Sequence, residues 1–351
     1  MSFKQQVIFW VATFALVVAM LWLLSEILLP FVAGMALAYL LNPLTNRLER
    51  FGISRWLAAL MIVGVVVLII IVLMLLIVPI LANQLAALIS SIPGYVTRLQ
   101  QLLVDPEWPW LRQIIGTDDA SKTISDLVSQ GSGWLATFVR SLWSGGRALV
   151  SIFSLVIVTP VVAFYLICDW PHVLVTIEKW IPLQHRDTVI SLAREIDAAI
   201  AGYVRGQTGV CLILGSFYAV SLSLVGLNFG LLIGLISGLI TFIPYLGSMT
   251  GLILSVGVAV AQFWPEWTWI MAVLGIFLVG QFVEGNILAP KFVGENIGLH
   301  PVWLMFAMFA FGYLFGFVGL LVAVPLAAAM GVLLRFALRQ YLASPLYTGG
   351  N

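Results

Sequence analysis

One acidic residue stands alone in the most apolar part of this sequence. Glu284 lies in "QFVEGNILAPKF", residues 281–292, and between Arg205 and Glu284 the only other Asp, Glu, Lys, Arg or His is Glu266. A carboxylate inside hydrocarbon is costly unless it is paired, hydrated or protonated, so such a residue by default indicates a cavity or a proton path. Glu284 therefore predicts a site that handles a proton, a cation or a polar solute.

Two residues that follow Glu284 belong to the same candidate site. Asn286 offers an uncharged polar side chain, and Pro290 follows it four residues later. The alternative interpretation is structural: Glu284 would end a helix at the membrane interface and pair there with Lys291 or Arg205.

A second candidate site is the stretch "TFIPYLGSMTG", residues 241–251, in which Pro244, Gly247 and Ser248 come together. Proline frees a backbone carbonyl and kinks a helix. Irregular backbone at membrane depth is tolerated only where protein buries it or where it lines a watery cavity. Transporters often bind substrate at such breaks, although kinks also occur in purely structural helices.

The elements that position these residues are long apolar helices. The chain of 351 residues is 62% hydrophobic and 9% charged, against roughly a quarter charged in soluble domains. A helix needs about 20 apolar residues to cross a bilayer, and β-barrel strands would alternate over about ten residues instead. Four runs lack Asp, Glu, Lys and Arg altogether: 56–97, 148–168, 206–265 and 296–334. We therefore expect an all-α, polytopic helical bundle embedded in a lipid bilayer.

The apolar runs and the polar stretches between them predict the domain organisation. Within the first segment, "NPLTNRLERFGISR", residues 42–55, is expected to form a polar loop. Residues 229–263 and 301–334 are expected to be helical hairpins, either as full spans or as re-entrant elements. The segments are 1–82 as membrane helices, 83–147 as a small helical extracytoplasmic domain, 148–171 as a membrane helix, 172–205 as a cytoplasmic amphipathic segment, and 206–340 as a membrane transport core.

Small residues at helical spacing indicate where helices approach closely. Four glycines recur every four residues on one helical face, and a second pair lies in the later hairpin: Gly226, Gly230, Gly234 and Gly238, then Gly312 and Gly316. Such spacing lets helices associate in lipid. The packing could join helices within one chain, or it could form a subunit interface or a sliding face.

The distribution of Lys and Arg predicts the orientation. With the N-terminus inside, the basic residues outside all lie in 83–147, a long segment of the kind that translocates largely regardless of charge. Both termini are therefore expected in the cytoplasm. The inside residues are Lys4, Arg47, Arg50, Arg55, Lys179, Arg186, Arg194, Arg205, Lys291, Arg335 and Arg339.

Composition and motifs argue against several other classes. A net charge of +1 gives no reason to expect nucleic acid as a partner. Cys168 and Cys211 lie in apolar runs, and no Cys/His cluster has metal-ligand spacing, so we expect neither a metal nor a cofactor. The sequence has no GxxxxGK[ST] loop and no HExxH motif, which disfavours an ATP-driven pump and an enzyme.

Several motifs in order resemble one known family. "FYLICDW" at 164–170 precedes an amphipathic "AGYVRGQ" segment, and "FIPYLGSMTG" follows a glycine-spaced helix. "QFVEGNILAPKFVGENIGLHP" and "LFGFVGLLVAVPLAAAM" come next. Together they resemble the AI-2E (autoinducer-2 exporter-like) transporters of bacterial inner membranes, over nearly the whole chain and most strongly from about 160 to 335.

The resemblance implies secondary transport by a homo-oligomer, with a pentamer as the implied assembly. Some members export a small furanosyl signalling molecule, whereas others exchange Na⁺ or Li⁺ for protons. For export of such a neutral or sugar-like solute, Gln207, Asn228, Ser248 and Asn286 would form an uncharged polar pocket. For antiport, Glu284 would exchange a proton for a cation. A passive channel and a non-transporting membrane scaffold are the remaining alternatives.

Overall fold

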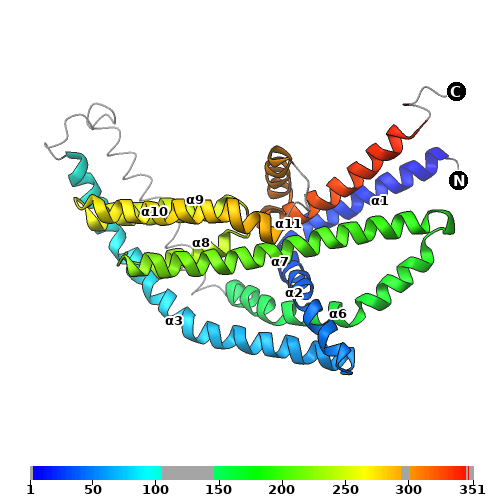
Figure 1. The fold of residues 1–351 in the computed structure, drawn as a ribbon, viewed down its shortest axis with the longest axis horizontal. Coiled ribbons are helices and arrows are strands. Elements are labelled where there is room, and N and C mark those ends of the chain that lie inside the picture. The colour runs from blue at the N-terminus through cyan, green and yellow to red at the C-terminus, as the bar shows by residue number, and fades with distance from the viewer. Residues whose placement is uncertain (1–2, 105–145, 294–299, 345–346, 348–351) are drawn as a thin grey trace. The chain divides into compact units, whose positions relative to one another are not determined.

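The computed structural model describes residues 3–104, 146–293, 300–344 and 347, and within these ranges every regular element is a helix (Figure 1). Seven of these helices are long and apolar enough to cross a membrane. The long uncharged runs of the sequence form these helices because a helix satisfies all its backbone polar groups internally, as lipid requires. The chain is therefore an all-α, multi-pass membrane protein, as the sequence predicts.

The elements follow one another in chain order as a series of helices of very different length. They are α1 (Phe3–Leu23), α2 (Ser25–Arg50), α3 (Arg55–Val104), α6 (Gly146–Trp180), the 3₁₀ turn η1 (Leu183–His185), α7 (Arg186–Leu224), α8 (Gly230–Ile240), α9 (Leu246–Phe263), α10 (Trp267–Val283), the π-helix η2 (Glu284–Val293) and α11 (Pro301–Leu342). Of the expected domain 83–147, residues 83–104 continue α3, and 105–145 lie outside the described residues.

The chain divides into two compact units, which are described one at a time. Unit 1 comprises Met1–Val67, Phe153–Gln207 and Ala289–Asn351, and unit 2 comprises Leu68–Ile152 and Thr208–Leu288. In unit 1, small and branched side chains of α2, α3 and α6 form an apolar core. Its buried members are Ala38, Leu41, Ala59, Ile62, Val63, Ala163 and Ile167.

Helix α2 runs through most of the region that the sequence led us to expect as a polar loop. The helix continues to Arg50, and only residues 51–54 connect it to α3. The expectation was wrong because the polar residues are themselves at helical spacing. Asn42, Asn46 and Glu49 are four and three residues apart, which places them on one face of the helix.

In unit 2, α8 and α9 form the first expected hairpin. The chain leaves helical geometry between Ile240 and Leu246, where Tyr245 adopts a left-handed φ of 67° that is unusual for a bulky residue. Helix α8 has 11 residues, or about 16 Å of helix, so it is too short for the roughly 30 Å of bilayer hydrocarbon. The hairpin therefore has one arm that cannot cross the membrane by itself.

The glycine face of α8 packs against α7. A Cβ added at Gly230, Gly234 or Gly238 would collide with the backbone of α7, at Leu222, Ala219 and Gly215 respectively. These three glycines therefore permit backbone-to-backbone contact inside unit 2. Gly226 has a different role from the packing role expected for it: it lies in the turn after α7 with φ +77°, and nothing surrounds the position of its Cβ.

The second expected hairpin is α11 in unit 1. The backbone turns at Gly316, with φ 60° and ψ −139°, a conformation that glycine adopts readily and other residues avoid. Gly312 lies against Leu320, and Gly319 against the carbonyl of Phe311. Residues eight apart would be about 12 Å from each other in a straight helix. The two arms thus fold against one another, and Figure 1 shows them running in different directions.

Candidate functional site

The helix carrying Glu284 changes its winding at that residue. Helix α10 ends at Val283, and the π-helix η2 begins at Glu284 and contains Pro290. The Asn286 side chain donates to the Phe282 carbonyl at 3.0 Å. π-Helical turns are rare and occur frequently at functional sites. The distortion therefore starts at the acidic residue and includes Pro290.

Glu284 shares a helical face with residues that pack on α7. Phe277 and Gly280 precede it by seven and four residues, which places all three on one side of the helix. The Phe277 ring stacks on that of Tyr218, with centroids 4.5 Å apart. Gly280 leaves room for the Tyr218 ring, which a Cβ at that position would overlap. Glu284 continues this contact surface toward α7.

One oxygen of the Glu284 carboxylate is buried without a hydrogen-bond partner in the described part of the chain. Its Oε2 atom is buried and has no hydrogen-bond partner among the described residues, and the same holds for the hydroxyl of the fully buried Tyr218. Glu284 interacts electrostatically with two residues of α7: Tyr218, and Cys211, which precedes Tyr218 by about two helical turns. A buried carboxylate oxygen without a hydrogen-bond partner is rare in native proteins. It can accept a proton or bind a polar group that approaches it.

The break between α8 and α9 places Gly247 and Ser248 inside unit 2. A Cβ at Gly247 would collide with the backbone and hydroxyl of Thr241, so this glycine closes the hairpin tip. Ser248 is buried and lines a hollow of about 240 Å³. The other lining residues are mainly apolar: Tyr245, Met249, Leu252, Phe277, Leu278 and Gln281. The tip is therefore tightly packed, with an apolar hollow beside it.

Asn228 holds the open end of the same hairpin. Its backbone N–H donates to Gln262 Oε1 at 2.7 Å, and its side chain donates to the Tyr95 hydroxyl at 3.1 Å. Gln262 in turn donates to the Gly226 carbonyl at 2.8 Å. Nearby, the Leu232 N–H in the first turn of α8 donates to the side chain of Gln84. The Asn228 position is thus a structural clamp.

The four polar residues expected to form one pocket have separate sets of contacts. Asn228, Ser248 and Asn286 lie in unit 2, where Asn228 contacts Gln262 and Tyr95, Ser248 lines the apolar hollow, and Asn286 bonds to the Phe282 carbonyl. Gln207 is buried at the end of the α7 segment that belongs to unit 1. The uncharged pocket predicted from these side chains is not assembled within either unit.

Unit 1 contains a cavity that the sequence did not reveal. Its volume is about 330 Å³, within the roughly 300–1,000 Å³ range of small-molecule sites. Helices α2, α3, α6 and α7 line it with polar and apolar side chains: Met35, Ala38, Tyr39, Asn42, Asn46, Arg55, Leu166, Ile167, Trp170, Pro171, Leu174, Asp197 and Arg205.

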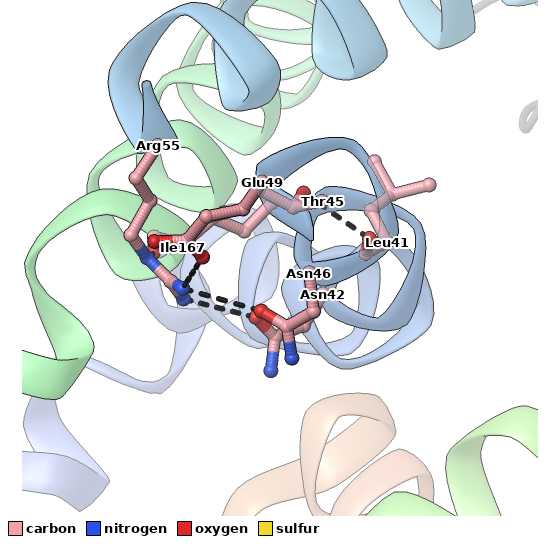
Figure 2. A network of polar contacts seen from close by, with 7 residues as sticks. All are labelled: Leu41, Asn42, Thr45, Asn46, Glu49, Arg55 and Ile167. Atoms are coloured by element: carbon pink, nitrogen blue, oxygen red, sulfur yellow. Dashed lines mark hydrogen bonds and ion pairs between the residues drawn. The ribbon is translucent and has the colours of Figure 1, made fainter. Parts of the chain in front are cut away.

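Arg55 organises one wall of this cavity (Figure 2). Its guanidinium donates to the side-chain oxygens of Asn42 at 3.1 Å, Asn46 at 3.2 Å and Glu49 at 3.0 Å, all on α2. Its Nε donates to the Ile167 carbonyl on α6 at 2.8 Å. That carbonyl lies four residues before Pro171, whose missing N–H would otherwise bind it. One side chain thus joins three helices.

Arg205, another lining residue, makes the same kind of contact. Its Nε donates to the Tyr39 carbonyl at 3.0 Å, which lies four residues before Pro43 in α2. The Tyr39 hydroxyl donates to Asp197 Oδ1 at 2.9 Å. The sequence contains one signal of this arrangement, namely a proline inside each of two helices, Pro43 in α2 and Pro171 in α6. The prolines do not indicate which arginines bind the freed carbonyls, because those arginines are remote in the chain.

Comparison with known proteins identifies the family to which this chain belongs. The family model of the AI-2E family transporters matches residues 11–339. YrrI of Bacillus subtilis (strain 168) is 30% identical, covering 95% of this chain and 97% of its own length. PerM of Escherichia coli (strain K12) is 27% identical, over 86% of this chain and 85% of its own.

A third relative has a name that specifies a solute. TqsA of Escherichia coli (strain K12), named an AI-2 transport protein, is 24% identical, over 90% of this chain and 86% of its own. The family match covers nearly the whole chain and extends across both units and both hairpins. This chain belongs to the AI-2E family of transporters.

Proposed function

We propose that this transporter moves a small neutral or sugar-like solute, of the AI-2 kind named for TqsA, outward across a bacterial inner membrane. The observation that carries the proposal is the buried Oε2 atom of Glu284, which has no hydrogen-bond partner among the described residues and lies at the start of the π-helix. A carboxyl group that can gain and lose a proton beside a distorted helix is suited to couple solute movement to a proton gradient.

A single carboxylate in this region fits a neutral solute better than it fits a cation. Hard cations such as Na⁺ prefer several oxygen ligands, as divalent ions do. Glu284 is the only carboxylate between Glu266 and Lys291. The Na⁺(Li⁺)/H⁺ antiporter remains the second candidate, because an unpartnered carboxylate oxygen is also a cation ligand.

We further propose cytoplasmic termini and a homo-oligomer, with a pentamer as its expected form. The orientation is supported by the basic residues, since Arg47, Arg50, Arg194, Arg335 and Arg339 all belong to unit 1 and fall on the inside of the expected threading. Labelling of an engineered single cysteine at exposed Ser191, in cells and in inverted vesicles, tests the orientation: inward exposure supports it, and labelling in intact cells contradicts it.

Flux into liposomes tests the transport function. Purified wild-type protein is reconstituted with and without an imposed proton gradient, and an AI-2-type furanosyl solute and Na⁺ are offered side by side. We expect solute flux that the gradient accelerates. Glu284→Gln should fold and lose the acceleration, whereas Glu266→Gln, the other acidic residue of this region, should retain it.

The other outcomes identify the alternatives. Gradient-driven Na⁺ flux without solute flux would establish the antiporter. Solute flux in the wild type that does not depend on the proton gradient would indicate a passive channel. Absence of both solute flux and Na⁺ flux would indicate a membrane scaffold. Wild-type gradient response in Glu284→Gln would show that this residue is structural.

A further inference from the structure

We infer that the unit 1 cavity is the recognition site for a neutral, hydroxyl-rich small molecule, and that Asn42 and Asn46 are its specificity-determining donors. The inference rests on the proposed function, because it assigns the solute class to a place in the fold. It differs from the sequence-based expectation, which built the polar pocket from Gln207, Asn228, Ser248 and Asn286.

The orientation of the two amides follows from Arg55. A guanidinium has only donors, so both asparagines must turn their oxygens toward it. Figure 2 shows the consequence: the two amide nitrogens point to the same side, away from Arg55. Both residues line the cavity. Four N–H bonds are therefore available on neighbouring turns of one helix to a ligand that carries several acceptor oxygens.

The charges around the cavity cancel. Arg55 pairs at 3.0 Å with Glu49, which is not itself one of the lining residues. The remaining charged lining residues are Arg205 and Asp197, one of each sign. An anionic ligand would meet the Asp197 carboxylate, and a cation would meet the Arg205 guanidinium. The balance favours an uncharged ligand.

The cavity also offers an acceptor and an apolar wall. Asp197 Oδ1 receives the Tyr39 hydroxyl, which leaves Oδ2 to accept an O–H from a ligand. A ligand hydroxyl both donates and accepts, so a polyol can satisfy Asp197 and the asparagine amides together. Trp170, Leu174 and Met35 line the same cavity and give its C–H surface an apolar partner.

The walls are held in place before a ligand arrives. Arg55 and Arg205 are each anchored on a carbonyl freed by proline, at 2.8 and 3.0 Å. A donor set fixed in advance loses little side-chain entropy on binding. The cavity is thus built as a binding site and is more than a packing defect between helices.

Ligand binding to the full chain in nanodiscs of neutral lipid tests the inference. The probes are D-ribose, as a neutral polyol, and inorganic phosphate, as an anion; binding is followed by ligand-observed NMR titration. The test variants are Asn42→Asp and Asn46→Asp, which keep an oxygen for Arg55 but replace the amide N–H donors of these two lining residues. Asn83→Asp, an exposed asparagine on α3 in unit 2, is the matched control.

We expect saturable ribose binding in the wild type and in Asn83→Asp, weakened about tenfold or more by either cavity variant because two donor hydrogen bonds are lost. The thermal midpoints of the variants check that they fold. Absence of saturable ribose binding, or equal ribose binding in all variants, would overturn the inference. Stronger binding of phosphate than of ribose would assign the cavity to anions.

The flux assay separates this inference from the proposed function. If wild-type protein carries the furanosyl solute and Asn46→Asp carries it equally well, the cavity assignment fails while the transport function stands. If the wild type carries no neutral solute, the transport function fails whatever the cavity binds. Loss of both ribose binding and flux in Asn46→Asp supports the two proposals together.

Discussion

The Nε atom of Arg55 lies 2.8 Å from the carbonyl oxygen of Ile167, the acceptor that Pro171 leaves without its helical donor. Arg205 stands in the same relation to the Tyr39 carbonyl and Pro43. Prolines are tolerated in membrane helices where neighbouring groups satisfy the freed carbonyls. Here guanidinium groups do so, and the two prolines thereby fix the walls of the unit 1 cavity.

Arg55→Lys should destabilise unit 1. An ammonium cannot present the planar fork that reaches Ile167, Asn42 and Asn46 together. We expect a loss of about 2 kcal/mol, the size of a charged hydrogen bond, seen as a lower thermal midpoint in detergent. Arg50→Lys, at the exposed end of α2, is the control. Equal midpoints for the two variants would show that the guanidinium geometry is unimportant.

The proline and the arginine should be energetically coupled. In Pro171→Ala the restored N–H can bind the Ile167 carbonyl, so Arg55 loses its role there. Arg55→Lys should therefore cost about 1 kcal/mol less in the Pro171→Ala background than in the wild type. A double-mutant cycle of thermal stabilities measures the difference. Additive effects would mean that proline and arginine act independently.

Replacing each of two helical glycines with alanine should change the stability of the protein in opposite directions. At Gly238 a Cβ would meet the backbone of Gly215 on α7, so Gly238→Ala should cost about 1–3 kcal/mol by overpacking. At Gly275 nothing lies within 4 Å of the Cβ position, so Gly275→Ala should stabilise by up to about 1 kcal/mol. Thermal midpoints of the two variants measure both effects, and a stable Gly238→Ala would contradict the observed close contact.

Removing the charge of Glu284 should not weaken the fold. Its buried Oε2 has no hydrogen bond to lose, and burying a charged group is itself unfavourable. Glu284→Gln should therefore melt no lower than the wild type, and so should Glu266→Gln at the turn before α10. A clear drop in the midpoint of Glu284→Gln alone would reveal a stabilising partner.

The features predicted correctly from the sequence are local ones. Uncharged runs of adequate length gave the membrane helices, and Pro244 with Gly247 marked the break between α8 and α9. The three glycines of α8 share a face because a repeat of four follows the helical turn. Each of these signals lies within one short segment of chain.

The cavity of unit 1 was missed because its contacts are remote in sequence. Arg55 is 112 residues from Ile167, and Arg205 is 166 residues from Tyr39. A proline shows that a carbonyl is free, but it does not show which donor will bind that carbonyl. The polar face of Asn42, Asn46 and Glu49 had helical spacing, and its hydrophilic composition nevertheless suggested a loop.

The shortness of α8 has a consequence for how the protein is made. A helix of 11 residues is too short to be held across the bilayer as an independent span during synthesis. Its glycine face has a partner only once α7 is already in place. We therefore expect α8 and α9 to leave the insertion machinery as a pair, so that for this hairpin entry into the lipid and tertiary assembly are one event.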